Sequence, residues 1–263
     1  MSVAEKYIGA KTPSKPETIY MLRLADNTLI LGQRLSEMCG HAPEMELDIA
    51  LTNISLDLIG QAKLLFEHIL TLEDLAPNAD VLAMTRPLEQ YTNCLFVAQP
   101  NVDFAHIMLK QYLFSTMQKL QYEALLESRD ETLAAIAEKS LKEIAYHIRF
   151  AKTWLLRLGD GTEESRTRMA DALDCLWRFT GEMFVRDAGL ADAVNAGLST
   201  DFTQHYDGWT LEVESVFTEA GGLTPPETAR MIMGGHQGQH DDNLGHILAD
   251  MQFMQRSYPG LKW

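Results

Sequence analysis

Apolar residues recur at helical spacing along almost the whole chain, and this repeat constrains the fold more than any other feature. In residues 131–158, for example, the repeat includes Leu133, Ile136, Ile144 and Leu155. Residues three or four positions apart share one face of an α-helix. We find no pair of alternating segments typical of β-strands. The sequence therefore predicts an all-α protein.

Glycine, proline and capping residues divide the repeat into separate helices. Asp130 is a predicted N-cap, and Asn101 is a second. Residues 187–200 lack a clear pattern, and two short helical pieces are expected between Pro77 and Pro100. Longer helices are expected over residues 18–38, 44–71, 102–128, 131–158, 163–186, 202–219, 226–233 and 239–258. The second of these is apolar on several faces, so it is expected to be packed on both sides.

The first four long segments form two helical hairpins joined by a connection of roughly 30 residues, a layout typical of ferritin-like bundles. We therefore predict a ferritin-like four-helix bundle with additional C-terminal helices. Residues 18–263 are expected to form this single domain. Residues 1–17 contain lysines and prolines without an apolar stretch, and we expect a flexible N-terminal extension there.

Charge and composition exclude several classes of protein. The net charge of −15 opposes nucleic-acid binding, and no apolar run approaches the roughly 20 residues that span a bilayer. The N-terminus lacks the apolar core of a signal peptide. Three widely spaced cysteines, Cys39, Cys94 and Cys175, are expected to be reduced and buried. We expect a cytoplasmic protein without nucleic-acid or membrane partners.

A ferritin-like bundle builds a di-iron site from two single carboxylates and two Glu-x-x-His pairs. Residues at equal distances from a helical turn lie side by side, and the turn centres near residues 42 and 129 set the register. Asp57 is then expected opposite Asn27, and Glu143 opposite Ser115. In each Glu-x-x-His pair the histidine follows the carboxylate by three residues. Here those two positions hold Gly60 and Tyr146 instead of histidine.

Only Asp57 and Glu143 keep a side chain suited to iron. A shift of one residue brings in Asp26 or His147, but no register restores all six ligands. The predicted site is therefore degenerate, and no catalytic or metal-binding residue is assigned to this chain. A buried carboxylate without a cation is costly, so both acids should have hydrogen-bonding or cationic partners.

Three other pairs of side chains have the spacing of metal ligands. Glu143 and His147 are four residues apart, and a hydrogen bond between them is favoured over a metal site. His236 and His240 lie among glycines, where a solvated loop and helix start are expected. Asp103, three residues before a histidine, is better explained as a helix cap.

Two stretches of sequence point to a known family. They are LRLADNTLILGQRLSEMCGHAPEMELDIALTNISLDLIGQA at residues 22–62 and KEIAYHIRF at residues 142–150. Both resemble the C subunits of the bacterial ring-1,2-phenylacetyl-CoA epoxidases (the PaaC family). Shorter matches at Leu176–Thr180 and from Gly234 to Trp263 extend the resemblance over nearly all of residues 18–263.

The resemblance implies a structural, iron-free subunit of a multicomponent monooxygenase. In such a complex a related catalytic A subunit holds the di-iron centre and epoxidises the ring of phenylacetyl-CoA with O2. A separate reductase with FAD and an iron-sulfur cluster supplies the electrons. The chain is then expected to pair with the A subunit and other subunits of the complex, or to form a homodimer when isolated.

Two alternatives stay open from the residues alone. One is an independent ferritin-like di-metal oxidase or hydroxylase, which requires ligands from positions not identified above. The other is an iron-storage bundle, against which Asn27 and Ser115 argue, because such bundles need carboxylates there.

Overall fold

All regular elements in the described part of the chain are helical. The computed structural model describes residues 10–227 and 230–258, which contain ten α-helices and no strand. The prediction of an all-α protein is confirmed. The four longest helices carry the bundle: α1 (Pro16–Ser36), α2 (Met45–Leu72), α5 (Phe104–Glu123) and α6 (Glu131–Gly159).

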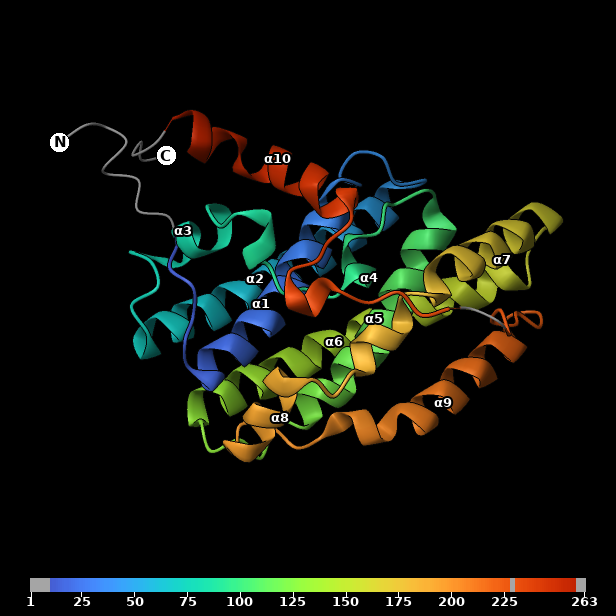
Figure 1. Ribbon diagram of the computed structural model, residues 1–263. Coiled ribbons are helices and arrows are strands. Elements are labelled where there is room, and N and C mark those ends of the chain that lie inside the picture. The colour runs from blue at the N-terminus through green and yellow to red at the C-terminus, as the bar shows by residue number, and fades with distance from the viewer. Residues whose placement is uncertain (1–9, 228–229, 259–263) are drawn as a thin grey trace.

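These four helices pack as the two predicted hairpins. Helix α1 packs along α2, α5 packs along α6, and α2 joins the hairpins by packing against α6. Figure 1 shows the α1–α2 hairpin beside the α5–α6 hairpin, with the remaining helices around them. The arrangement is that of the predicted ferritin-like bundle.

The crossover between the hairpins lies against α1. It contains α3 (Ala79–Met84), a 3-10 turn at Leu88–Gln90 and the single-turn helix α4 (Leu95–Ala98). Helix α4 packs on α1, and all four of its residues are buried. The crossover therefore closes one side of the bundle.

The C-terminal part wraps around the bundle. It consists of α7 (Glu163–Trp177), α8 (Ala188–Asn195), α9 (Tyr206–Glu219) and α10 (Asp242–Ser257), with 3-10 turns at Thr180–Phe184, Phe202–His205 and Gly235–Gln237. Helix α9 packs on α5 and α6, whereas α10 packs on α1, α3 and α4. Figure 1 accordingly shows α9 and α10 on opposite sides of the molecule.

Three predictions for the C-terminal part are wrong. The described residues of 226–233 are not helical, because this segment runs past the end of α7, where the Ile232 amide donates to the Arg178 carbonyl at 2.7 Å. The helix predicted over 163–186 ends at Trp177 and continues as a 3-10 turn. Residues 187–200 contain α8, which Asp187 caps.

The helix caps explain where the second hairpin begins. Asp130 caps α6 by accepting from the Leu133 amide at 3.0 Å, as predicted. Helix α5 is capped by Asp103 rather than by Asn101. Asn101 instead donates to the Arg34 carbonyl and accepts from the buried ammonium of Lys110.

The described N-terminal residues are tied to the end of α2. The Lys11 amide donates to the Leu75 carbonyl at 2.8 Å, and the Ser14 hydroxyl donates to Glu73 at 2.6 Å. Pro16 and Glu17 already belong to α1. Residues 1–9 of the predicted extension lie outside the described residues, and the division into extension and single domain stays a prediction.

Helix α2 is buried on one side only. Leu51, Ile54 and Leu58 face the core, but Ile49 and Leu56 are exposed, so the expectation of packing on both sides is wrong. By length and composition α2 could span a membrane, with half of its most apolar window buried. Core helices of soluble proteins also have these properties, so this is weak evidence for a membrane span.

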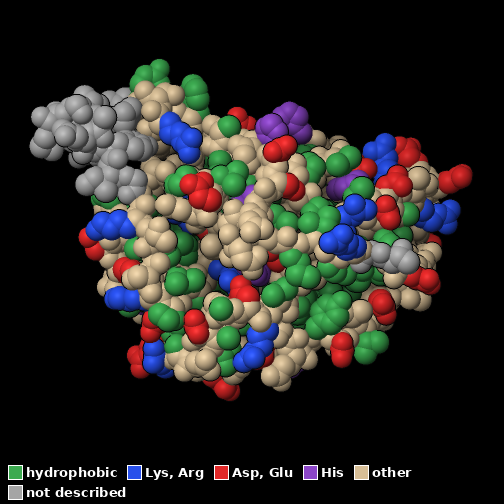
Figure 2. Space-filling model, in the orientation of Figure 1, with side chains coloured by type: hydrophobic (Ala, Val, Ile, Leu, Met, Phe, Trp, Pro, Cys, Tyr) green, Lys and Arg blue, Asp and Glu red, His purple; other side chains and the backbone are tan. Residues whose placement is uncertain are grey.

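Surface exposure also corrects the cysteine prediction. Cys94 is buried as expected, whereas Cys39 and Cys175 are exposed, and all three are free. On the face seen in Figure 1, acidic and basic side chains are interspersed with apolar ones (Figure 2). The excess of acids therefore does not form one continuous patch on that face.

Candidate functional site

Two of the six predicted ligand positions, Asp57 and Glu143, lie at the contact between α2 and α6, which we call the α2–α6 seam. It contains Asp57 and Gln61 of α2 and Glu143 and His147 of α6. The His147 Nε2 atom lies 3.1 Å from Asp57 Oδ2, with the imidazole fully buried and the carboxylate about one-third exposed, 35%. Asp57 and Gln61 are four positions apart on α2, and Glu143 and His147 are four positions apart on α6. This spacing places both members of each pair on one face of their helix. The two helices therefore present polar rows to each other.

A relay of amides ends on Glu143. The Gln118 side-chain amide of α5 donates to Gln61 Oε1 at 3.1 Å, and the Gln61 amide donates to Glu143 Oε2 at 2.9 Å. Gln118 and Gln61 are buried, whereas Glu143 is half-buried. The carboxylate thus receives a hydrogen bond and keeps access to water, which removes the need for a cation.

The hydrogen-bond geometry assigns the tautomer of His147. Its Nε2 atom faces a carboxylate, which only accepts hydrogen bonds. A hydrogen is therefore on Nε2, and in the neutral imidazole Nδ1 is left as an acceptor. That Nδ1 atom is buried and has no hydrogen-bond partner among the described residues. Asp57 and Glu143 thus have the partners that the sequence predicted, although neither is fully buried.

The other predicted positions are dispersed. Ser115 is buried on α5 and accepts from the Gln111 amide at 2.8 Å. Asn27 is buried on α1 but turns toward the crossover, where its side chain accepts from the Cys94 amide at 2.8 Å. Gly60 is half-buried on α2, and exposed Tyr146 stacks on Phe150 with ring centroids 6.1 Å apart.

The register explains part of this dispersal. The Ser55 hydroxyl donates to the Gly32 carbonyl at 2.7 Å, so the midpoint of the first hairpin lies between residues 43 and 44 rather than at 42. This offset moves the α1 residue that faces Asp57 about three positions along the helix, away from Asn27. The proposed pairing of Glu143 with His147 is also wrong, because His147 bonds Asp57 and Glu143 bonds Gln61.

The seam does not fit a di-metal centre. Among residues 10–227 and 230–258, no three His, Cys, Asp or Glu side chains are arranged to hold a metal ion. At the seam itself one Glu143 oxygen already accepts from Gln61, and His147 is bonded to Asp57. A di-iron site needs four carboxylates and two imidazoles, whereas the seam offers two carboxylates and one imidazole. We assign no metal chemistry to this seam.

The remaining histidine pairs have structural partners. Asp103 accepts from the His106 amide at 2.9 Å and contacts the His106 ring at 2.8 Å, which confirms the capping prediction. His240 contacts the Tyr91 carbonyl through Nε2 at 2.8 Å. His236 is buried, so the prediction of a solvated loop there is wrong.

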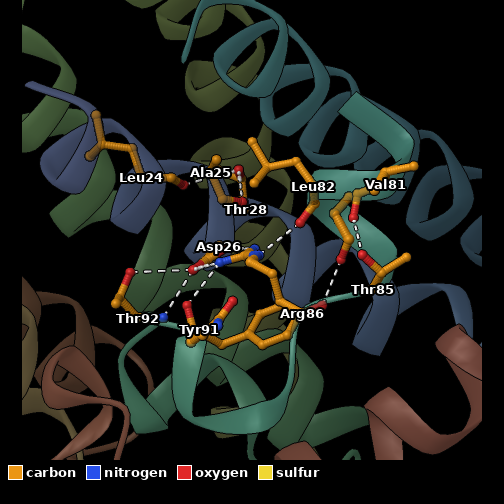
Figure 3. Close-up of polar contacts among 12 residues, drawn as sticks. Leu24, Ala25, Asp26, Thr28, Val81, Leu82, Thr85, Arg86, Tyr91 and Thr92 are labelled. Carbon is orange, nitrogen blue, oxygen red and sulfur yellow. Dashed lines mark hydrogen bonds and ion pairs between the residues drawn. The ribbon is translucent and has the colours of Figure 1, made fainter. Parts of the chain in front are cut away.

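A second group of buried charges lies where α1 contacts the crossover. The sequence analysis did not identify this group. Asp26 pairs with Arg86 of the crossover through the two terminal guanidinium nitrogens, and both side chains are almost fully buried. The Thr92 amide donates to the same carboxylate at 2.9 Å, and the guanidinium carbon lies 4.1 Å from the Tyr91 ring centroid. Figure 3 shows the carboxylate enclosed by these donors.

The electrostatics of this pair are favourable despite burial. Burial lowers the pKa of Arg86, but the adjacent Asp26 carboxylate outweighs it, so the pKa lies above its usual value. The guanidinium also donates to the Leu82 carbonyl at 2.7 Å and to the Gln90 carbonyl at 3.0 Å. Nearly every donor of Arg86 is thus satisfied, which is the condition for a stable buried ion pair.

A neighbouring ion pair joins α1 to α8. Arg23 donates to both oxygens of Asp187 at 2.9 and 2.6 Å. Burial raises the pKa of Asp187, but the hydrogen bonds and charge of Arg23 lower it more, and the result lies below the usual value. His236 Nδ1 is 3.9 Å from this carboxylate. Burial, followed by the positive charge of Arg23, lowers the pKa of His236 to about 3.

Glu182 fixes the C-terminal segment against the crossover. Its buried carboxylate accepts from the backbone amides of Leu95, Gly234 and His236 at 2.7 to 3.1 Å. Gly235 lies so close that an added Cβ would be 2.2 Å from the Asn93 carbonyl oxygen. Glycine is required here for close backbone approach. We call Arg23, Asp26, Arg86, Glu182 and Asp187 the α1 anchor cluster.

The signals for the missed residues differ in kind. Gln61 and Gln118 occupy core positions of amphipathic helices, where an amide is unusual and could have been noticed. Arg86 lies in a segment punctuated by prolines, 60 residues from its partner. No local pattern indicates that such a residue is buried.

Comparison with known proteins places the whole chain in one family. The family model described as phenylacetic acid catabolic protein matches residues 3–263. The C subunit of the 1,2-phenylacetyl-CoA epoxidase of Escherichia coli (strain K12) is 44% identical over 246 residues, which cover 94% of this chain and 98% of that protein. This chain is a member of the phenylacetic acid catabolic protein family.

Proposed function

We propose that this chain is the structural C subunit of a multicomponent di-iron monooxygenase in phenylacetate catabolism. The complex would epoxidise the ring of phenylacetyl-CoA, and this chain would pair with and stabilise the catalytic A subunit. The identity of 44% to the C subunit of an epoxidase, over almost the full length, supports this assignment. A protein of the cytoplasm follows from the same proposal.

The α2–α6 seam is the observation that carries the non-catalytic part of the proposal. Oxygen activation at a di-iron site needs carboxylates on four helices. At the corresponding region this chain has the amides of Gln61 and Gln118, and Glu143 accepts from Gln61. The iron of the complex would lie in the A subunit, and FAD and the iron-sulfur cluster in the reductase.

Metal counting and reconstitution test the proposal together. The chain is purified alone, and iron is measured by mass spectrometry after loading with Fe(II) without oxygen. The A subunit, treated identically, is the control. We expect less than stoichiometric iron on this chain, no oxygen uptake with a reductant, and epoxidation of phenylacetyl-CoA only when this chain, the A subunit and the reductase are combined.

Two results would overturn it. Stoichiometric iron that is lost in the variant with both Asp57→Asn and Glu143→Gln would make the chain an independent di-metal protein. Full epoxidation by the A subunit and reductase without this chain would remove its structural function. A stable complex with the A subunit, in which this chain is free of iron, would support the proposal.

A further inference from the structure

The outer side of the α2–α6 seam carries an apolar row that the described chain leaves uncovered. On α2, Met45, Ile49 and Leu56 are 72%, 56% and 61% exposed. Spacings of four and seven residues keep them on one face of the helix. Thr52 and Asn53 separate Ile49 from Leu56. Single exposed apolar side chains are ordinary, but three on one helix face indicate an interaction surface.

Helix α6 extends this row with aromatic side chains. Because Asp57 contacts His147 across the seam, the preceding residues Leu56 and Tyr146 lie at its outer rim. Tyr146 is exposed and stacks on Phe150. Aromatic residues with an apolar body and a polar tip are enriched in protein interfaces. The row of α2 and the rings of α6 thus form one surface over two helices.

The solvent face of α6 carries more cations than acids although the chain has a net charge of −15, and its exposed acids are Glu131 and Glu138. Its four exposed cations, spaced three to eight residues apart, are Lys139, Lys142, Arg149 and Arg157. None of the four forms an ion pair with a described residue. Arg149 lies over the Tyr146 ring at 5.6 Å and Arg157 over the Trp154 ring at 5.0 Å. Cations without a carboxylate partner beside an apolar row favour a partner of opposite charge and set its orientation.

We propose that this α2–α6 outer face is the docking surface for the catalytic partner subunit. The occupant is a helix, or a pair of helices, with an apolar row flanked by aspartate or glutamate residues. The face runs roughly 27 Å along α6 at 1.5 Å per residue. The apolar row runs roughly 17 Å along α2 by the same measure, so this face supplies part of the roughly 800 Å² that a stable interface buries on each partner.

This inference rests on the proposed function and adds the location and chemistry of the contact. A second copy of this chain would bring the same cations to the face, so acidic partner residues match it better. A lipid surface could also combine apolar contact with negative charge. These two occupants are therefore tested beside the partner subunit.

The experiment compares surface variants in binding to the purified A subunit. Leu56→Glu places a charge in the apolar row, and Arg149→Glu reverses a cation of α6. The matched controls are Leu211→Glu on α9, where the leucine is 69% exposed, and Arg166→Glu on α7. Affinity is measured by calorimetry and size by light scattering, after circular dichroism shows that each variant is folded; Ile49→Glu replaces Leu56→Glu if that variant fails to fold.

Leu56→Glu should raise the Kd for the A subunit at least thirty-fold, as for a residue at the centre of an interface. Arg149→Glu should raise it about tenfold, with a smaller effect at high salt. Both controls should bind like the unsubstituted chain. If the unsubstituted chain binds the A subunit and Leu56→Glu binds it equally well, the α2–α6 outer face is not the docking surface. The proposed function stands in that case. No binding by the unsubstituted chain refutes the proposed function itself.

The other occupants have their own readouts. A homodimer of the isolated chain that Leu56→Glu converts to a monomer would assign the face to a second copy. Sedimentation with vesicles of phosphatidylcholine and phosphatidylglycerol, abolished by Leu56→Glu, would assign it to a membrane. Either result overturns the partner subunit as occupant, and their absence together with weakened A-subunit binding supports it.

Discussion

The two polar regions of the bundle satisfy their carboxylates in opposite ways. In the α1 anchor cluster, Asp26 is fully buried and is paired with the fully enclosed guanidinium of Arg86. In the α2–α6 seam, Asp57 and Glu143 are partly exposed and are bonded to an imidazole and an amide. Full burial of a charge requires an opposite charge, whereas partial burial needs only hydrogen bonds and water. The difference indicates that the anchor cluster holds the fold together, while the seam tolerates change.

The largest expected effect comes from breaking the anchor cluster. Arg86→Met leaves the Asp26 carboxylate buried without its cation, and we expect a loss of about 3–5 kcal/mol in the free energy of unfolding. Urea denaturation at pH 7, followed by circular dichroism, measures it. The control Arg166→Met changes an exposed arginine of α7 and should stay within about 0.5 kcal/mol. A loss below about 1 kcal/mol for Arg86→Met would contradict the comparison.

His236, beside Asp187 of the anchor cluster, should also make stability depend on pH. The pKa of His236 is about 3 when folded, against an ordinary 6.5, so the unfolded chain binds more protons between these values. Stability from this group is complete above pH 6.5 and is lost as pH falls toward 3, with about 2 kcal/mol lost by pH 5. The lowered pKa of Asp187 acts in the same direction, but only near and below its ordinary value of 3.8.

Variants separate the histidine from other groups. His236→Gln cannot gain a charge, so its free energy of unfolding should change by less than about half as much as that of the parent between pH 7 and 5. His41→Gln, at an exposed histidine, should keep the parental slope. An unchanged slope in His236→Gln would show that His236 is not buried in neutral form.

At the seam the expected effects are smaller. Gln61→Met removes the middle of the amide relay, and leaves the buried Gln118 amide without its acceptor. Glu143 is half-buried and can turn to water. We expect a loss of about 1–2 kcal/mol in the free energy of unfolding, measured as for Arg86→Met. A loss as large as that of Arg86→Met would remove the distinction between the two regions.

The smallest effect is expected for Glu143→Gln. The new amide keeps an oxygen that can accept from Gln61, and the site does not require a charge. We expect a change within about 0.5 kcal/mol. Marked destabilisation would mean that a cation neutralises Glu143 in the folded protein.

The parts of the fold that depend on local chemistry were predictable. Helices α2 and α6 begin and end within one residue of their predicted limits, because apolar periodicity and the Asp130 cap are local signals. The helix expected at 226–233 was wrong, since a tertiary contact to Arg178 holds that segment in a non-helical conformation. Helix α8 was missed because it is short and its cap, Asp187, is also engaged by Arg23.

The candidate site was predictable only in part. That Asp57 and Glu143 would have polar partners followed from the cost of isolated buried charge. Which partners they have depends on how α2 slides past α6, and the sequence contains no local signal for that register. The same limitation hid the Asp26–Arg86 pair, whose members are 60 residues apart.

The uncovered row on α2 has a consequence for how cells make this protein. The proposed docking surface of Met45, Ile49 and Leu56 also attracts other apolar surfaces while it is uncovered. Association with the partner would cover this surface, prevent such nonspecific contacts and stabilise the chain by mass action. Synthesis of the two subunits in matched amounts would therefore determine how much of the chain stays in solution, as directly as the stability of its own core does.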